Sequence, residues 1–154
     1  MKELRTLVFT ATYNEADNIE ELVRAISSSA PEADILVVDD ASPDNTGGLL
    51  EEIARHNSRL SIVHRPRKAG LGRAHMLAMK RAIAGGYDVL VTMDADFSHN
   101  PSYLPELLAR LQEGEDFVIG SRYTRGGSCD YGLLRQLLSR GANTVAIWLL
   151  GIRL

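Results

Sequence analysis

The segment VTMDADFSHNP, residues 91–101, contains the pattern on which the predicted architecture depends. Its first residues are apolar and rich in Val, which is typical of a buried β-strand. The strand pattern runs directly into Asp94 and Asp96, and a helical pattern opens at Pro101 with leucines at spacings of three and four. The stretch therefore predicts a strand, an acidic loop and a helix in immediate succession.

The same succession recurs along the whole chain. Short apolar segments at residues 4–10, 34–40, 60–64, 88–94 and 116–121 predict buried strands. Helical patterns lie between them: Ile19, Leu22, Val23 and Ile26; Leu49, Leu50 and Ile53; Ala74, Leu77 and Ala78; and Leu104, Leu107, Leu108 and Leu111. The first is preceded by Asp17 and Glu20, which resemble a capping box, and a last helical pattern covers residues 133–150. The alternation predicts an α/β fold, with a mostly parallel sheet, helices on both faces and ligands beyond the strand C-termini.

The composition predicts one soluble domain over residues 1–154, since 45% of the residues are hydrophobic and 24% are charged. A single cysteine, Cys129, excludes an internal disulfide framework and a cysteine-rich metal site, which favours a reducing setting such as the cytoplasm. We expect no secretion signal. The late apolar run at residues 145–152 is shorter than a membrane span, although it could contact a membrane surface.

Charge is divided unevenly between the two ends of the chain. The net charge is −3, but the residues from Ser121 onward contain five arginines and one acid. The late part is therefore suited to binding anions, and the first 120 residues to binding cations or metal-bound ligands.

Asp94 and Asp96 are candidate metal ligands. Two carboxylates one residue apart can grip one divalent ion if the chain stays extended, and hard oxygen ligands suit Mg²⁺ or Mn²⁺. The alternative is a pair of turn or capping acids. For His99 three roles stay open: ligand, packing residue or cap.

The segment VVDDASPDNTG, residues 37–47, places a second acid pair at a strand end. Asp39 there can accept hydrogen bonds from ribose hydroxyls or base N–H groups. Alternatively Asp40, Ser42 and Asp44 only organise the turn and cap the next helix. We expect both: Asp39 binds a ligand, and Asp44 caps.

The segment RPRKAGLGRA, residues 65–74, sets basic residues beside two glycines at a strand-to-helix turn, where a backbone can approach a phosphate. It lacks the third small residue of GxGxxG and follows the third strand, which argues against a dinucleotide-fold dehydrogenase. The position of the Asp94 and Asp96 pair, after the fourth strand, also excludes an aspartyl phosphatase and a receiver-type phosphoacceptor.

The late basic residues suggest an anion site. On a helix, Arg135 and Ser139 lie four apart and share a face, and Arg122 and Arg140 add positive charge nearby in the sequence. The alternative is a solvated basic face.

Taken together, five motifs resemble the inverting family 2 glycosyltransferases with a GT-A fold, and most of all their polyprenyl-phosphate (dolichyl-phosphate) mannose synthase branch. The motifs are ATYNE, VVDDASPDNTG, RKAGLGRA, MDADFSHNP and GSRYTRGG, and they cover nearly the whole chain. The resemblance implies transfer of mannose from GDP-mannose to a polyprenyl phosphate with inversion. It implies a cytoplasmic enzyme at the inner face of a membrane, with no nucleic-acid partner.

The resemblance also implies residue roles. The nucleotide sugar is bound by Thr12, Tyr13, Glu15, Val37, Asp39, Lys68, Gly70, Asp94 and Ala95. Asp94 and Asp96 hold Mg²⁺ or Mn²⁺ and, with Arg122, act in catalysis. Arg122, Arg135 and Ser139 receive the acceptor phosphate. Since a phosphate monoester is already anionic, the implied mechanism needs no strong protein base.

Three features depart from the family pattern. Ala11 stands where proline is usual, and Ser98 stands where some members have a glutamine metal ligand. Family members generally continue beyond a segment like residues 142–154, so we expect a domain truncated at its C-terminus. Two alternatives stay open: a related transferase with UDP-glucose or another donor or acceptor, and a non-catalytic sugar-nucleotide binding domain.

Overall fold

The computed structural model describes residues 4–121 and 133–150. The chain divides into two compact units, Met1–Val118 and Ile119–Leu154, and each is described by itself. The second unit contains one described helix, α5 (Leu133–Leu150), over the residues that the periodicity predicts. The single domain over residues 1–154 stays a prediction.

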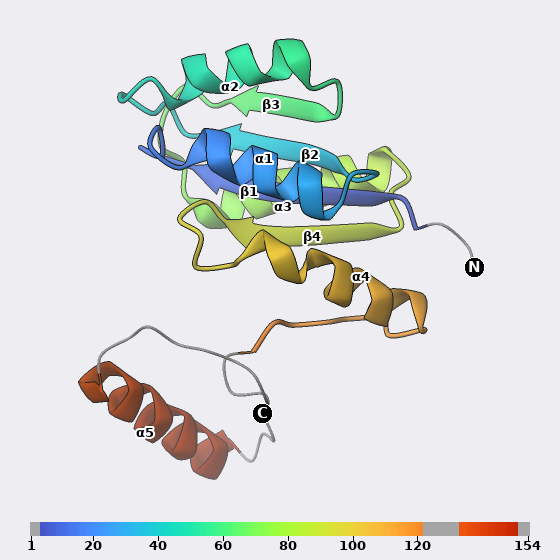
Figure 1. Ribbon diagram of the computed structural model, residues 1–154. Helices are drawn as coiled ribbons and strands as arrows, with labels where there is room; N and C mark the ends of the chain where they lie inside the picture. Colours follow the sequence, from blue (N-terminus) through green and yellow to red (C-terminus); the bar gives the residue numbers. More distant parts are fainter. Residues whose placement is uncertain (1–3, 122–132, 151–154) are drawn as a thin grey trace. The chain divides into compact units, whose positions relative to one another are not determined.

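The first unit is built on four parallel strands: β1 (Thr6–Thr12), β2 (Asp34–Asp39), β3 (Leu60–His64) and β4 (Val89–Asp94). Their order is β3-β2-β1-β4 (Figure 1). The chain moves outward from β1 to β3 and then returns to pair β4 on the other side of β1. The order therefore reverses between β1 and β4, which is where open α/β sheets bind ligands.

The register aligns the strand ends that carry polar residues. Thr12 pairs with Asp39, Asp39 pairs with His64, and Ala11 pairs with Asp94. The carboxyl ends of all four strands consequently form one edge of the sheet, as the sequence predicts.

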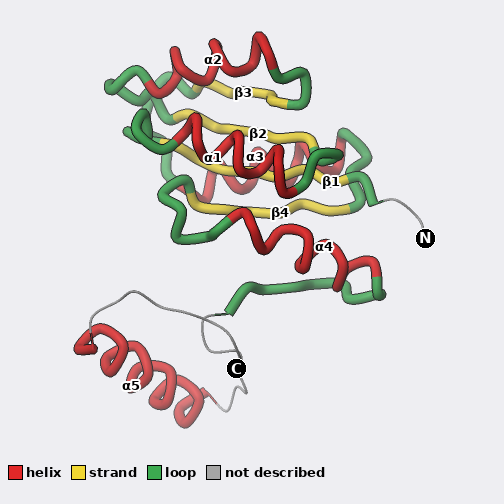
Figure 2. Tube along the Cα trace, in the orientation of Figure 1, coloured by secondary structure: helices red, strands yellow, loops and turns green. Residues whose placement is uncertain are grey.

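Helices cover both faces of this sheet, which confirms the predicted architecture (Figure 2). One face carries α1 (Ile19–Ser29), α2 (Thr46–His56) and α4 (Leu104–Gln112), the last preceded by the 3₁₀ turn η1 (Pro101–Tyr103). The other face carries α3 (Leu71–Ala84).

Alternating side chains of the strands explain the two faces. In β1, Val8 packs toward Leu22 and Leu50, whereas Phe9 packs on the opposite side with Ala74 and the other buried alanines of α3. Because both sides of each central strand are buried, the strand sequences are almost continuously apolar.

Two local predictions are wrong. Residues 116–121 form no strand: Phe117 and Ile119 are 78% and 70% exposed, and no described strand pairs with this segment. An apolar run gains strand structure only where a neighbour completes its hydrogen bonds. The first strand is present as predicted, with bounds of Thr6–Thr12 rather than residues 4–10.

The capping box of Asp17 and Glu20 is the second wrong prediction. Helix α1 starts after Asn18, and no side chain caps it. The backbone carbonyl of Glu15 accepts instead from the amides of Asn18 and Ile19, at 3.0 and 2.9 Å. The preceding turn thus satisfies amides that a capping side chain would otherwise bind.

Candidate functional site

Three loops meet at the C-terminal edge of the sheet, and each contains a non-glycine residue with positive φ. Asn14 follows β1, Ala41 follows β2 and Phe97 follows β4, with φ angles of 62°, 56° and 60°. Asparagine tolerates this conformation, but in alanine and phenylalanine it costs about 1–2 kcal/mol. Such strain gathers at functional sites. This edge is therefore the candidate site.

The β4 loop brings Asp94 and Asp96 to one point. The Ser98 hydroxyl donates to Asp96 Oδ1 at 2.6 Å and lies 3.5 Å from Asp94 Oδ2. The Ser98 amide also donates to Asp96 Oδ1, at 2.9 Å. The two carboxylates face the same small polar group, and the described residues place no arginine or lysine in an ion pair with either.

The ionisation of Asp96 suits a metal ligand. The Ser98 hydroxyl, and then its amide, hold the pKa of the Asp96 carboxyl below the ordinary 3.8. His99 closes the same turn, because its Nδ1 accepts from the Asp94 amide at 3.2 Å. Of the three roles left open for His99, the structure favours the cap.

The carboxylate pair fits Mg²⁺ or Mn²⁺. Within the described ranges, no group of three or more His, Cys, Asp or Glu side chains could hold a metal. Two carboxylates nevertheless suffice for Mg²⁺, which usually keeps several waters and completes its shell with substrate phosphates.

At the end of β2, two adjacent acids have different partners. Asp39 is only 3% exposed, and its carboxylate accepts from the Thr12 hydroxyl at 3.3 Å and from the hydroxyl and amide of Ser42. Asp40 instead forms a buried ion pair with Arg65 and accepts from the Ala69 amide at 3.2 Å. Asp40 therefore organises the loop, and the Asp39 carboxylate lies at the site edge.

Arg65 is a structural residue that sequence reasoning missed. Its guanidinium binds Asp40 through Nε and donates to the Gly70 carbonyl through Nη2 at 3.1 Å. It thereby fixes both ends of the loop between β3 and α3. The sequence did contain a signal for this role. Arg65 directly follows β3, and β3 pairs with β2, which ends at the acid pair Asp39 and Asp40.

Tyr13 and Lys68, both predicted to bind the nucleotide, lie together. The Lys68 ammonium is 3.7 Å from the centre of the Tyr13 ring, a cation–π contact. Gly70 follows with φ of +89°, which only glycine adopts readily, and α3 begins at the next residue. An aromatic face, a cation and a helix N-terminus are brought to one corner of the site.

The β1 and β2 loops are tied to each other. The Glu15 amide donates to the Thr46 hydroxyl and the Ala16 amide to Asp44 Oδ2, both at 3.0 Å. Asp44 also accepts from the amide of Thr46, the first residue of α2, but the N-cap residue of this helix is Asn45 and not the predicted Asp44. The Thr46 hydroxyl is the main cause of the lowered pKa of Asp44. The Glu15 carboxylate accepts from Asn18 Nδ2 at 2.8 Å.

Two predicted residues have side chains behind this edge, and three others belong to the second unit. The side chains of Val37 and Ala95 are buried in the core behind it. Arg122 lies outside the described residues, and Arg135 and Ser139 belong to α5, where the Arg135 side chain is not described. The acceptor-phosphate set stays a prediction.

Comparison with known proteins identifies the family. The model of Glycosyl transferase family 2 matches residues 7–147, so the chain belongs to that family. A polyprenol monophosphomannose synthase of Mycolicibacterium smegmatis is 45% identical over 150 residues, which cover 96% of this chain and 57% of that protein. An undecaprenyl-phosphate mannosyltransferase of Micrococcus luteus is 38% identical over 152 residues, 98% of this chain and 62% of that protein. The chain thus spans only 57% and 62% of the length of these relatives.

Solved structures confirm the predicted GT-A fold. The mannosyltransferase PcManGT from Pyrobaculum calidifontis, in complex with GDP-Man and Mn²⁺, superposes with a TM-score of 0.55 at 29% identity, over 62% of this chain and 28% of that one. S. aureus TarS 1-349 gives a TM-score of 0.58 at 25% identity, over 71% of this chain and 33% of that one. In the described part of this chain, no helix is both long and apolar enough to cross a bilayer.

Proposed function

We propose that this protein transfers mannose from GDP-mannose to a polyprenyl phosphate, with inversion at the anomeric carbon and dependence on Mg²⁺ or Mn²⁺. The observation that carries the proposal is the convergence of Asp94 and Asp96 on one hydroxyl at the point where the strand order reverses. The names of the two relatives, both mannose transferases to polyprenyl-type phosphates, support the sugar and the acceptor.

The donor nucleotide would bind along the edges of β1 and β2. The Asp39 carboxylate, fixed by Thr12 and Ser42, can accept hydrogen bonds from the ribose or base. Tyr13 offers a ring face, and Lys68 beside it can turn toward a phosphate. Gly70 lets the backbone approach the diphosphate at the start of α3, where amides are free to donate.

Asp94 and Asp96 would hold the divalent ion. When bound, the ion neutralises the charge that develops on the departing diphosphate. The chain's own contribution is to aim both carboxylates at one place, through Ser98 and the His99 cap, and the Ser98 hydrogen bonds also hold the pKa of Asp96 below its ordinary value. A preorganised charge arrangement of this kind is a large part of transferase catalysis.

The acceptor phosphate would be received by Arg122, Arg135 and Ser139. An acceptor oxygen attacks the anomeric carbon on the face opposite the leaving group, its bond to carbon forms as the bond to GDP breaks, and the configuration inverts. Because a phosphate monoester is largely deprotonated near neutral pH, no protein base has to remove a proton. We further propose that residues 1–154 act as one transferase domain, at the cytoplasmic face of a membrane.

A transfer assay tests the proposal. Purified protein, polyprenyl phosphate and radiolabelled GDP-mannose should give a lipid-linked mannose only when Mn²⁺ or Mg²⁺ is present, with a β-linkage by NMR. Asp96→Asn should abolish the product, while Asp116→Asn, an exposed acid outside the site, should leave it unchanged. UDP-glucose used in preference to GDP-mannose, or product formed equally in excess chelator, would contradict the proposal.

A further inference from the structure

The outer face of α3 is apolar where the fold does not need it. Helix α3 packs on the sheet through three alanines, Ala74, Ala78 and Ala82, all buried. On the opposite side Met76, Met79 and Ile83 are 55%, 45% and 80% exposed. Their spacings of three and four place them in one stripe along the helix. Contiguous exposed apolar side chains of this kind mark an interaction surface.

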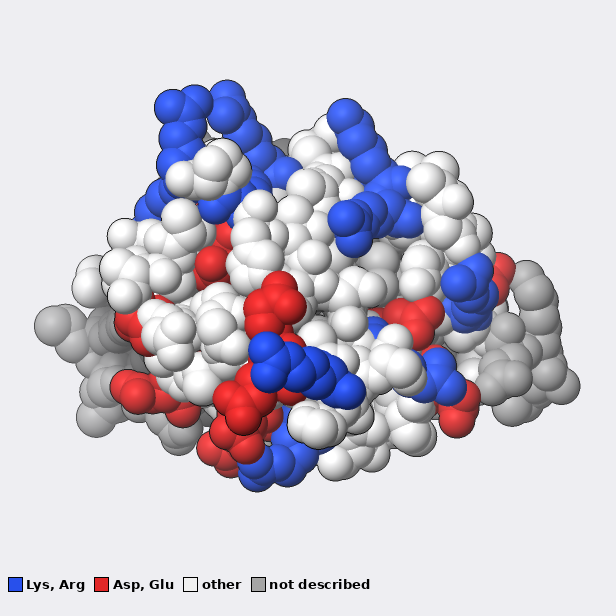
Figure 3. Space-filling model, turned by 90° about the horizontal axis from the view of Figure 1, so that it is seen from above, with Lys and Arg blue, Asp and Glu red and all other residues white. Residues whose placement is uncertain are grey.

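The same segment is strongly basic. Residues 65–84 contain six arginines and lysines and no acid, in a chain whose net charge is −3. Arg65 and Lys68 are engaged by Asp40 and Tyr13. In the described part of the chain, Arg73, Lys80 and Arg81 have no ion-pair partner. On the face drawn in Figure 3, Lys and Arg side chains project from the upper edge, and others lie among the acidic side chains nearer the centre and lower edge.

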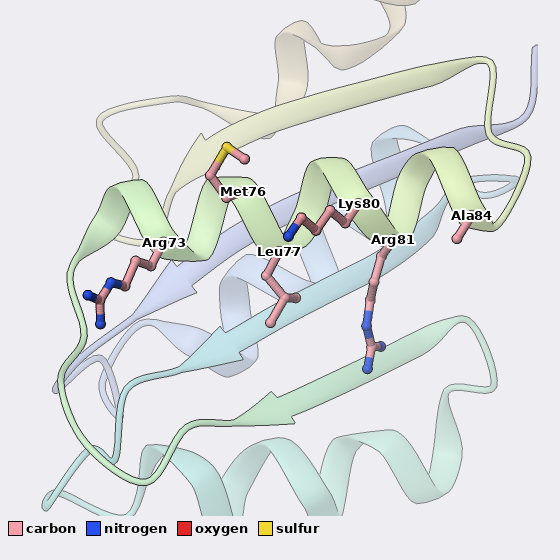
Figure 4. A pocket seen from close by; sticks show the side chains of 6 residues that line it. All are labelled: Arg73, Met76, Leu77, Lys80, Arg81 and Ala84. Carbon is pink, nitrogen blue, oxygen red and sulfur yellow. The ribbon is translucent and has the colours of Figure 1, made fainter.

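Basic and apolar groups share one open hollow on α3. It is lined by Arg73, Met76, Leu77, Lys80, Arg81 and Ala84. Figure 4 shows Leu77 and Arg81 extending to one side of the helix and Met76 to the other, with Lys80 between them. The hollow is thus lined both by aliphatic side chains and by three cations. Such a hollow matches a lipid headgroup phosphate joined to its hydrocarbon.

We propose that the α3 outer face (Arg73, Met76, Met79, Lys80, Arg81 and Ile83) docks on a bilayer that contains anionic lipids. A helix with an apolar stripe and a basic flank lies in the plane of the membrane interface, with the stripe among the acyl chains and the cations at the phosphates. Charge selects this occupant: a purely apolar partner would leave three cations unpaired, and a nucleic acid would leave the Met76, Met79 and Ile83 stripe exposed.

The position of α3 connects this surface to the site. The helix begins just after Gly70, at the corner that holds Tyr13 and Lys68. A bilayer against its outer face therefore lies alongside the donor site. The inference rests on the proposed function in that a lipid-borne acceptor makes such docking useful, but the docking itself is measured without donor or acceptor.

Vesicle flotation tests the proposal. The full chain is mixed with vesicles of phosphatidylcholine, with or without phosphatidylglycerol, and should float only with the anionic vesicles. Each cation near an anionic surface contributes about fivefold in affinity, so Lys80→Gln with Arg81→Gln should weaken binding by about 25-fold. The matched control is Arg24→Gln with Arg55→Gln, which removes the same charge from α1 and α2 and should bind like the wild type.

A second variant tests the apolar stripe. Met76→Gln with Met79→Gln keeps every charge and the helix propensity, and should remove the vesicle binding that persists at high salt. GDP-mannose affinity, measured by calorimetry without lipid, should be unchanged in all variants and shows that each one is folded.

The outcomes separate this inference from the proposed function. If the wild type binds GDP-mannose but stays in the lipid-free fraction, the docking surface is wrong and the proposed function is unaffected. The docking surface is also overturned if the α3 charge variant and its control lose vesicle binding equally. The same holds if the methionine variant keeps its vesicle binding at high salt. Self-association that depends on Met76 and Met79, seen by sedimentation velocity, would assign the face to a second copy. Absence of GDP-mannose binding would count against the proposed function and leave the flotation result standing.

Discussion

Removing the Asp40 carboxylate should destabilise the protein strongly, because it leaves Arg65 buried without a counter-charge. The two side chains are only 8% and 10% exposed, so solvent screens the pair little. Breaking such a pair costs about 3–5 kcal/mol. The Ala69 amide also loses its acceptor, which adds about 1 kcal/mol. At about 4 °C per kcal/mol for a unit of this size, Asp40→Ala should lower Tm by about 16–24 °C.

A double-mutant cycle separates the pair from its surroundings. Asp40→Leu with Arg65→Met replaces both charges by apolar side chains, and buried pairs replaced in this way often retain their stability. We expect the double variant to unfold within about 2 kcal/mol of the wild type in urea, far above the Asp40→Ala protein. Its GDP-mannose affinity should stay reduced, because Arg65 no longer holds the Gly70 carbonyl.

The control for this cycle is Asp17→Ala, an exposed acid of the same unit. Its Tm should match the wild type. The reasoning is refuted if Asp40→Ala melts no lower than Asp17→Ala, or if the double variant is as unstable as the sum of the two single changes.

Three further predictions concern the site. Ser98→Ala should raise the pKa of Asp96 toward 3.8, because the hydrogen bond from the Ser98 hydroxyl is the largest cause of the lowering. In the wild type, ionised Asp96 stabilises the fold above pH 3.8, and this stabilisation fades as the pH falls through the lowered pKa of the folded state. NMR titration of the Asp96 carboxyl carbon in both proteins would measure the two pKa values. Gly70→Ala should lower the free energy of unfolding, measured in urea, by about 1–2 kcal/mol, because Gly70 has a φ of +89°. The control is Gly72→Ala, at a helical position with open space around it, which should be at least as stable as the wild type. Tyr13→Leu should weaken GDP binding by about threefold to tenfold in calorimetry, whereas Tyr13→Phe, which keeps the ring beside Lys68, should bind nearly as the wild type does; equal loss in both would argue against the ring.

Much of the fold follows from the sequence because both faces of the central strands are buried. Strand β2 is buried on both faces and reads as an apolar run with sharp polar ends, and its predicted bounds, residues 34–40, differ from the observed Asp34–Asp39 by one residue. The same rule failed at residues 116–121, where the apolar run has no described neighbouring strand. Pairing is a property of the tertiary structure, and a local pattern cannot supply it.

The candidate site was only partly predictable for a related reason. Asp94 and Asp96 could be found because both acids lie on one loop, two residues apart. The different roles of Asp39 and Asp40 were harder to predict, because they depend on Arg65, which follows another strand, β3. The acceptor-phosphate residues depend on the second unit and stay a prediction.

A direct measurement of Mn²⁺ binding shows whether Asp94 and Asp96 hold the metal. Mn²⁺ is titrated into the wild type with GDP-mannose and followed by electron paramagnetic resonance, which should show one bound ion. Its affinity should fall at least about a hundredfold in Asp94→Asn and in Asp96→Asn, because each variant loses one of two protein ligands. Asp116→Asn should bind as the wild type does. One tightly bound Mn²⁺ retained in both site variants would place the metal elsewhere and rule out Asp94 and Asp96 as its ligands.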